Sequence, residues 1–368
     1  MSSDSDPVLS VDGVSVHFDT DTGLLSRFRE SNAVRAVQNV SLDVGDSDVV
    51  ALVGESGCGK TTLGKTAIGV QRPTEGTVRY RGQDVWAAKD GHQETTIRAT
   101  EIRRNLQMIH QDPGSSLNPN RKVLGTLAVP LKKWQPELSS EDRRARIFGL
   151  LKEVGMTPPN DYAGRYPHQL SGGEKQRVAL VRALLMNPDV ILADEAISAL
   201  DVSLRVEMMD LFLELQDQFQ TSFIFISHDL SNARYLAEES GGRIAVMYLG
   251  RIVEIGTAEE IVNNPQHPYT KALRWATPDL QPNEETEQPL RTVDVPDPKN
   301  PPSGCAFHTR CPEAREACTA AVPDLTGTDA ASHKSACFRA DDGHQYWDSE
   351  PLEAVEEEET TSAAPDGR

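Results

Sequence analysis

The chain has 368 residues, of which 56 are Asp or Glu and 37 are Lys or Arg, so its formal net charge is -19. A field of that sign repels nucleic-acid phosphates, which disfavours proteins that act on DNA or RNA. No stretch approaches the roughly 20 continuous apolar residues of a membrane helix, and the N-terminus MSSDSDP is unlike a signal peptide, so a cytosolic protein is expected.

The first expected elements are short strands between residues 8 and 53. Apolar residues alternate over residues 14–18 and 40–44, and the run 49–53 is continuously apolar. A run without polar alternation indicates a strand that is buried on both faces of a mostly parallel sheet. Residues 8–50 and 76–86 are expected to form an antiparallel β-subdomain.

The segment GESGCGKTT follows this buried strand and is typical of a phosphate-binding loop. Its glycines allow backbone N–H groups to surround phosphates, Lys60 supplies positive charge, and the Thr61 hydroxyl can reach Mg²⁺. A chance glycine-rich turn is the alternative. Cys58 needs only to be small, so no thiol chemistry is assigned to it. The predicted nucleotide-binding residues of this segment are Gly54, Glu55, Ser56, Gly57, Cys58, Gly59, Lys60, Thr61 and Thr62.

Loops and helices are expected between Gln111 and Leu170. The stretch HQDPGSSLNP at residues 110–119 is dense in turn-forming residues and predicts a loop. Residues 141–154 carry apolar side chains at helical spacing. A helical subdomain over about 112–170 is the interpretation. Taken alone, Gln111 would be an unremarkable polar residue.

The block LSGGEKQR places Ser171, Gly172 and Gly173 directly before a helix with periodic apolar residues. The N-terminus of a helix has free N–H groups and favours an anion. Because Lys60 already marks a phosphate site in the same chain, the natural interpretation is a phosphate bound in trans. Two copies of the domain would then hold the nucleotide between them.

Polar residues follow two further buried strands, at 190–193 and 223–226. Asp194 and Glu195 follow the first strand and His228 follows the second. Carboxylates at such positions can order Mg²⁺ and activate water. A lone histidine is more often a surface residue or a satisfied core residue. A helix expected over 203–219 is interpreted as core packing.

Taken together, these motifs resemble those of the ABC-type ATPases in type and in order. The resemblance implies an α/β P-loop fold with a mostly parallel core sheet, an antiparallel β-subdomain and a helical subdomain. It also implies that ATP and Mg²⁺ are bound. In that family, Asp194 would position the Mg²⁺ shell, Glu195 would act as general base, and His228 would contact the γ-phosphate.

The same resemblance assigns three more residues. Gln111 matches the glutamine that joins the metal site to a transmembrane partner, so it counts with Thr61 and Asp194 among the Mg²⁺ residues. Asp201, in SALD, matches the loop that crosses the dimer interface. Phe18 stands where the family has an aromatic residue that stacks on adenine, although it could simply pack within an N-terminal strand.

Four blocks narrow the resemblance to the ATPase subunits of oligopeptide and dipeptide importers. They are HQDPGSSLNP, SALDVS, MYLGRIVEIG and NPQHPYTKAL. The insert at 19–32 is similar to the second of the two non-identical ATPases of such importers. The implied partners are a second ABC ATPase subunit, identical or homologous, two transmembrane permease subunits and, indirectly, an extracellular solute-binding protein. The chain would lie at the cytoplasmic face of the membrane as a peripheral protein.

Some alternatives stay open at this level. Nickel or oligosaccharides travel through related systems, and no residue here discriminates among these loads. The rival class is a soluble ABC ATPase that acts on nucleic acid or ribosomes, which the net charge and the single nucleotide domain oppose. One departure from the family is Ala196-Ile197 in place of Pro-Thr. The change removes a local stiffener but keeps both carboxylates, so hydrolysis is still expected.

The carboxyl-terminal part raises a second chemical question. The predicted segments are a nucleotide-binding domain over 1–277, a Pro-rich linker over 278–302, a cysteine-containing extension over 303–348 and an acidic disordered tail over 349–368. The cysteines of the extension are Cys305, Cys311, Cys318 and Cys337. Their spacing does not match the C-x₂-C pairs of a zinc ribbon, and a cytosolic chain argues against disulfides.

Four thiolates can hold a 4Fe-4S cluster without a particular fold. The extension resembles that of peptide-importer ATPases, some of which carry such a cluster on the corresponding cysteines. A zinc site with four thiolate ligands and unliganded thiols remain the alternatives.

The acidity of the chain is spread along its length. We predict adaptation to a salt-rich cytoplasm, as in a halophilic archaeon. An ordinary acidic soluble protein is the alternative.

Overall fold

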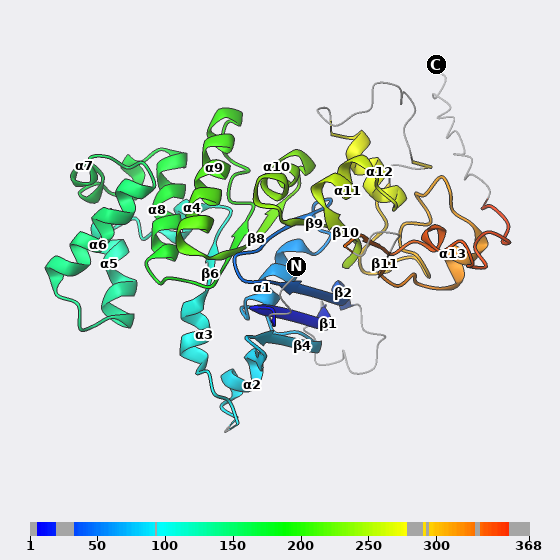
Figure 1. The fold of residues 1–368 in the computed structure, drawn as a ribbon, viewed down its shortest axis with the longest axis horizontal. Helices are drawn as coiled ribbons and strands as arrows, with labels where there is room; N and C mark the ends of the chain where they lie inside the picture. Colours follow the sequence, from blue (N-terminus) through cyan, green and yellow to red (C-terminus); the bar gives the residue numbers. More distant parts are fainter. Residues whose placement is uncertain are drawn as a thin grey trace, which may run out of the picture.

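The computed structural model describes residues 6–19, 33–92, 94–277, 290–291, 294–327 and 332–352. Two sheets organise these residues (Figure 1). In the described residues, no helix is long and apolar enough to cross a membrane. The helices are α1 (Lys60–Ala67), α2 (Val85–Asp90), α3 (Ala99–Asn105), α4 (Pro113–Ser116), α5 (Val123–Trp134), α6 (Ser140–Glu153), α7 (Pro159–Ala163), α8 (Gly172–Leu184), α9 (Val202–Phe219), α10 (Leu230–Ser240), α11 (Ala258–Asn263), α12 (Pro268–Trp275) and α13 (Glu316–Ala320).

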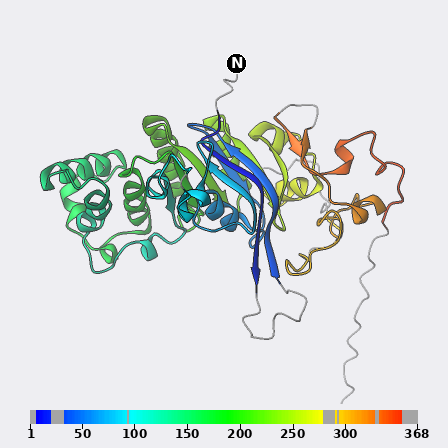
Figure 2. The same cartoon turned by 90° about the horizontal axis from the view of Figure 1, so that it is seen from below.

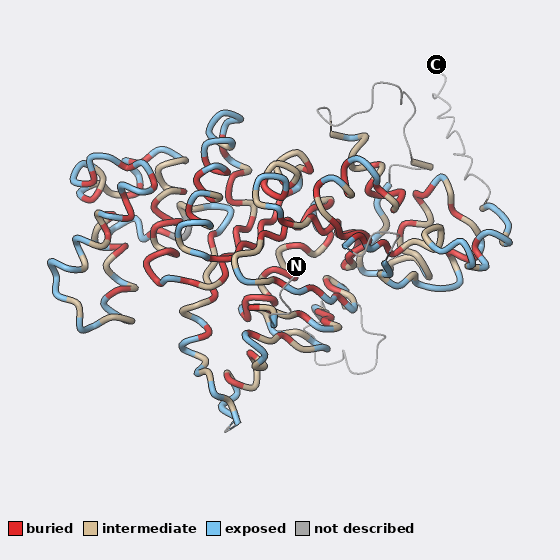
Figure 3. The backbone as a smooth tube through the Cα atoms, in the orientation of Figure 1, coloured by how far each residue is buried: buried red, intermediate tan, exposed pale blue. Residues whose placement is uncertain are grey.

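The core sheet has eight strands in the order β11-β12-β10-β9-β3-β8-β7-β6. The five strands from β9 to β6 are parallel neighbours, and β10 is antiparallel to β9. The bounds are β3 (Val49–Val53), β6 (Leu106–Ile109), β7 (Val190–Asp194), β8 (Ser222–Ser227), β9 (Arg243–Tyr248), β10 (Arg251–Thr257), β11 (Thr326–Gly327) and β12 (Lys334–Ser335). All residues of β3, β7 and β8 are buried, as their apolar runs predict (Figure 3). The predicted α/β P-loop fold is therefore confirmed.

The second sheet is antiparallel and has the order β2-β1-β4-β5. Its strands are β1 (Leu9–Asp19), β2 (Ala33–Val44), β4 (Glu75–Tyr80) and β5 (Gln83–Asp84). Figure 2 shows β1 and β2 running out from the body of the molecule as a long pair. The sequence predicts a strand only around residues 40–44, whereas β2 begins at Ala33. An irregular register between Val37 and Val40 shifts the buried side chains from even to odd positions, so the apolar alternation does not continue into the first half of β2.

The helical subdomain packs α5, α6 and α8 together at one side of the molecule (Figure 1). The apolar side chains predicted at 147–154 are buried there. Ser139 begins α6 with a reciprocal capping box, in which its hydroxyl accepts from the N–H of Asp142. Such caps satisfy N–H groups that a helix leaves unpaired.

The carboxyl-terminal extension is joined to the core sheet. Its strand β12 pairs with β10 in the register Glu254↔Ser335 and Ile255↔Lys334. The predicted tail begins at residue 349, but residues 349–352 do pack on the extension. The N–H of Glu316 donates to the carbonyl of Glu350, and the N–H of Leu352 donates to that of Ala314. The rest of that tail, most of the predicted linker and the insert 20–32 lie outside the described residues.

Candidate nucleotide site

The loop between β3 and α1 has the geometry of a phosphate cradle. Gly59 has a φ of +107°, and a Cβ there would lie 2.1 Å from the carbonyl oxygen of Ala36. Only glycine can take that position without a shift of the backbone. No side chain caps α1, so the N–H groups of its first turn are not used by a cap. Free N–H groups and the helix dipole together favour an anion here.

Lys60 is 4% exposed and lies over this cradle. Its Nζ donates to the carbonyl oxygens of Gly54 at 2.7 Å and Glu55 at 3.0 Å. The ammonium group thus lies against the loop itself. An ammonium group has three N–H donors, so the two carbonyl contacts leave one donor for a phosphate oxygen.

Thr61 and Asp194 meet at the edge of the loop. The Thr61 hydroxyl donates to Asp194 Oδ1 at 2.7 Å, and Asp194 is 6% exposed at the end of β7. A hydroxyl and a carboxylate are hard oxygen donors, which suit Mg²⁺. Bound there, Mg²⁺ would neutralise phosphate charge.

Gln111 and His228 both approach one carboxylate oxygen of Glu195. Gln111 Nε2 donates to Glu195 Oε2 at 3.0 Å, and His228 Nδ1 lies 3.7 Å from the same atom. Glu195 has a φ of +47°, a left-handed conformation that is strained for this residue type. Its N–H is held by the carbonyl oxygen of Ile226 on β8 at 3.1 Å. The backbone therefore directs this carboxylate toward Gln111 and His228.

Two hydrogen bonds to the carbonyl oxygen of Glu195 close the turn that follows it. Both the N–H and the hydroxyl of Ser198 donate to the carbonyl oxygen of Glu195, at 3.1 and 2.9 Å. Ala196 and Ile197 are buried in the core. These contacts fix the conformation of the turn that contains Ala196 and Ile197.

A cavity of about 430 Å³ lies beside the phosphate-binding loop, and neither Asp194 nor His228 is among the described residues that line it. Its wall includes Lys60, Gln111, Glu195 and residues that the sequence analysis missed. Those are Val34, Arg35, Ala36, Leu249, Gly250 and Pro298. No nucleotide-binding motif includes them. Val34, Arg35 and Ala36 lie on β2, Leu249 and Gly250 lie in the β9–β10 turn, and Pro298 lies ahead of the extension, so only the folded chain brings them to the loop. Phe18 is 39% exposed and lies opposite Val34 in the sheet, but it is not among the described residues that line the cavity.

The predicted trans-acting residues lie elsewhere. Ser171 is the N-cap residue of α8, and its hydroxyl accepts a hydrogen bond from the N–H of Glu174. Ser171 and Gly172 are exposed, and neither they nor Gly173 line the cavity. Asp201 begins α9, is exposed and makes no capping bond, and the adjacent Val202 is 75% exposed.

The four cysteines of the extension line one small cavity of about 20 Å³. The aromatic rings of Phe307, Phe338 and Tyr346 lie around it. Burial raises the pKa of all four thiols, to about 12 for Cys305 and about 11 for Cys337. Over the described ranges, no group of three or more His, Cys, Asp or Glu residues is arranged to hold a metal ion. The donor atoms converge without forming a metal site in this structure.

Comparison with known proteins places these features in a family. The family model described as ABC transporter matches residues 37–198, and the one described as oligopeptide/dipeptide transporter, C-terminal region, matches residues 253–318. The di/tripeptide transport ATP-binding protein DppF of Pseudomonas aeruginosa is 40% identical, over 91% of this chain and 98% of its own. The oligopeptide transport ATP-binding protein AppF of Bacillus subtilis is 39% identical, over 90% and 96%.

Solved structures show the same fold. A dimeric ATP-binding cassette in a post-hydrolysis state with ADP and Pi is 27% identical, with a TM-score of 0.56 over 68% of this chain and 98% of that chain. A component of the cbiONQ ABC transporter complex of Clostridium perfringens has a TM-score of 0.58 at 22% identity, over 74% and 96%. The chain therefore belongs to the ATP-hydrolysing subunits of the oligopeptide/dipeptide family of ABC transporters.

Proposed function

We propose that this protein powers the import of oligopeptides or dipeptides through separate membrane subunits. Two ATPase domains would close on ATP and separate after hydrolysis. The observation that carries the proposal is the meeting of Gln111, Glu195 and His228 beside the cradle of Lys60. Glu195 is placed to take a proton from the attacking water. Gln111 begins the loop that would transmit closure to the membrane subunits.

The nucleotide would be shared between two chains. Ser171 begins α8 with exposed N–H groups next to it, away from the cavity of its own chain. The exposed Asp201 and Val202 offer a further surface for a second subunit. Whether the second ATPase is identical or homologous is left to experiment.

The variant Ser171→Arg tests whether two chains contribute to one nucleotide site. We expect the isolated subunit to bind ATP within about twofold of wild type, because its own cradle is intact. Hydrolysis by the assembled transporter should fall at least tenfold, because the partner's phosphate meets a blocked helix end. Nucleotide fluorescence titration and phosphate release measure the two quantities.

Lys60→Ala is the matched comparison, and it should lose ATP binding already in the isolated subunit. If Ser171→Arg weakens binding by the isolated subunit as much as Lys60→Ala does, the phosphate contacts belong to a single chain. The proposed sharing would then be wrong.

The assignment of peptides as the transported substrate rests on the carboxyl-terminal region. Its family match starts within β10 and continues into the extension, and the relatives matched over nine-tenths of this chain carry peptide transport in their names. The test is reconstitution with co-purifying permease subunits and solute-binding protein in vesicles. Dipeptides and oligopeptides should stimulate ATP hydrolysis, with the ATPase bound peripherally at the cytoplasmic face. Stimulation by nickel or oligosaccharides alone would overturn the peptide assignment.

The cysteine extension would hold a 4Fe-4S cluster. The support is that Cys305, Cys311, Cys318 and Cys337 line one small cavity, since thiolates are the ligands of such clusters, although the described residues do not arrange them as a metal site. Metal binding would require these thiols to lose their protons.

Iron and sulfide analysis of anaerobically purified protein tests this proposal. We expect about four of each per chain, with visible charge-transfer absorbance. Cys311→Ser should lose both, whereas Cys58→Ser, at the phosphate loop, should keep them. Iron-free, colourless protein would leave zinc or free thiols, which metal analysis separates.

Three predictions stay as such. They are the stacking of adenine on Phe18, the segment boundaries at 277 and 302, and salt adaptation. For the last, the unfolding midpoint should rise between low and molar KCl.

A further inference from the structure

One buried arginine of the extension reaches the phosphate-binding loop. Arg310 is 4% exposed, and its Nη1 donates to Glu55 Oε2 at 3.0 Å. The same group lies 3.5 Å from the Tyr248 hydroxyl, and the guanidinium lies 5.8 Å from the ring centres of Tyr248 and Phe307. A charge is stable in such a place only if it is paired and in a defined position. Glu55 supplies the opposite charge.

Hydrogen bonds hold Glu55 at its N–H, its carbonyl oxygen and its carboxylate. Its N–H donates to the Tyr269 hydroxyl at 2.9 Å, and its carbonyl oxygen accepts from Lys60 Nζ at 3.0 Å. Arg310 holds the carboxylate. The contacts with Tyr269 and Arg310 do not involve Lys60, so they keep Glu55 in place whichever acceptors the ammonium group uses.

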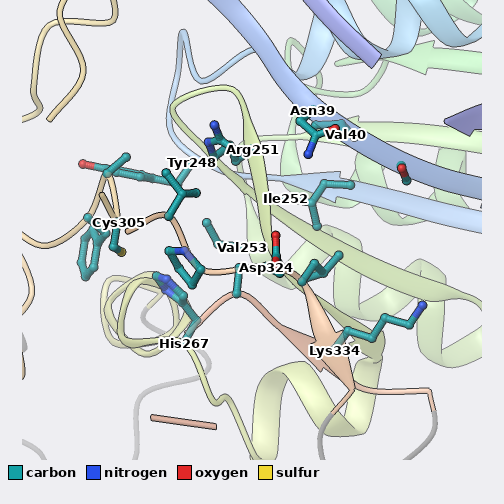
Figure 4. Close-up of a pocket in the computed structure, with 17 residues that line it drawn as sticks. Asn39, Val40, Tyr248, Arg251, Ile252, Val253, His267, Cys305, Asp324 and Lys334 are labelled. Atoms are coloured by element: carbon teal, nitrogen blue, oxygen red, sulfur yellow. The ribbon is translucent and has the colours of Figure 1, made fainter. Parts of the chain in front are cut away.

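Arg310 lies in a tight turn between Cys305 and Cys311. The N–H groups of Arg310 and Cys311 both donate to the carbonyl oxygen of Phe307, at 3.0 and 2.9 Å. The Phe307 ring is fully buried and packs edge-on against Tyr248 and Tyr269. Figure 4 shows Tyr248 and Cys305 close together at the wall of a neighbouring cavity of about 300 Å³. The turn and these rings set where the guanidinium lies.

We propose that Arg310 is a positioning residue for the ATPase reaction, which acts through Glu55 to hold the phosphate-binding loop ready for nucleotide. The extension is then part of the ATP site, and a change in shape of the turn from Cys305 to Cys311 changes the affinity for ATP. This inference rests on nucleotide binding at Lys60 and goes beyond it. It gives the extension a role in nucleotide binding that is independent of the transported substrate.

Arg310→Gln in the full-length chain tests the inference. We expect the Kd for a fluorescent ATP analogue, and the KM for ATP in the assembled transporter, to rise about tenfold. The kcat should change less than about twofold, because Glu195, Gln111 and His228 are untouched. Arg310→Lys should recover part of the affinity, since an ammonium can still pair with a carboxylate.

A double-mutant cycle separates positioning from general damage. Glu55→Gln should raise the Kd as much as Arg310→Gln does, and the double variant should be no weaker than either single variant. Arg339→Gln is the matched control in the same extension. It removes an ion pair with Glu313 at 2.5 Å and no contact with the loop, so ATP affinity should stay at the wild-type value.

Wild-type affinity in Arg310→Gln overturns the inference. An equal loss of affinity in Arg339→Gln, or fully additive effects in the cycle, does so too. A wild-type subunit that binds no ATP would instead contradict the nucleotide site itself.

Discussion

Glu195→Gln should lower the kcat for ATP hydrolysis by about 10² to 10⁴, the range that a positioned general base contributes. The amide keeps the size and the hydrogen-bonding oxygen of the carboxylate, so Gln111 can still contact it, but it cannot accept the proton of water. ATP should still bind at Lys60 and Thr61. The variant should therefore collect in an ATP-bound dimer, which size-exclusion chromatography with and without ATP detects.

The control for this experiment is Glu238→Gln on α10. Glu238 is exposed and pairs with Arg234 one turn earlier, at 3.1 Å. Such surface pairs contribute little, so the rate should stay within about twofold of wild type. Full turnover in Glu195→Gln would show that another group takes the proton.

Glu254→Ala should destabilise the protein by about 3 to 5 kcal/mol, as the loss of one partner from a buried charged network does. Glu254 is fully buried on β10. It accepts from the N–H groups of Gln266 and His267, at 2.7 and 3.0 Å, and its Oε1 lies 2.7 Å from His333 Nε2. Alanine removes the acceptor that the N–H groups of Gln266 and His267 use. The urea midpoint of unfolding measures the effect.

Two comparison variants make this second result specific. Glu254→Gln keeps one acceptor oxygen and should lose less stability than alanine does. Glu259→Ala, on the exposed side of α11, removes a single bond from Asn263 and should change stability by less than about 0.5 kcal/mol. A Glu254→Ala midpoint equal to that of Glu259→Ala would mean that this carboxylate does not fasten the extension to the core sheet.

The sequence alone determined the features whose cause is local. The run 49–53 has no polar residue, so it had to be a buried strand, and the glycines that follow permit the turn that surrounds phosphates. Ser171 directly precedes a segment with helical periodicity, and Glu174 follows it by three residues. The two side chains form the observed capping box. Lys60, Thr61, Asp194 and Glu195 could be named because each one stands next to such an element.

Only the tertiary structure decided which distant groups meet. Gln111 and Glu195 are 84 positions apart, and they touch because β6 and β7 are parallel neighbours that end at one edge of the sheet. Arg310 and Glu55 are 255 positions apart, and nothing periodic marks their pairing. The strand that joins the extension to β10 is two residues long, too short for an apolar pattern. Long-range contacts of this kind depend on sheet register and on the burial of paired charges, which spacing along the chain does not encode.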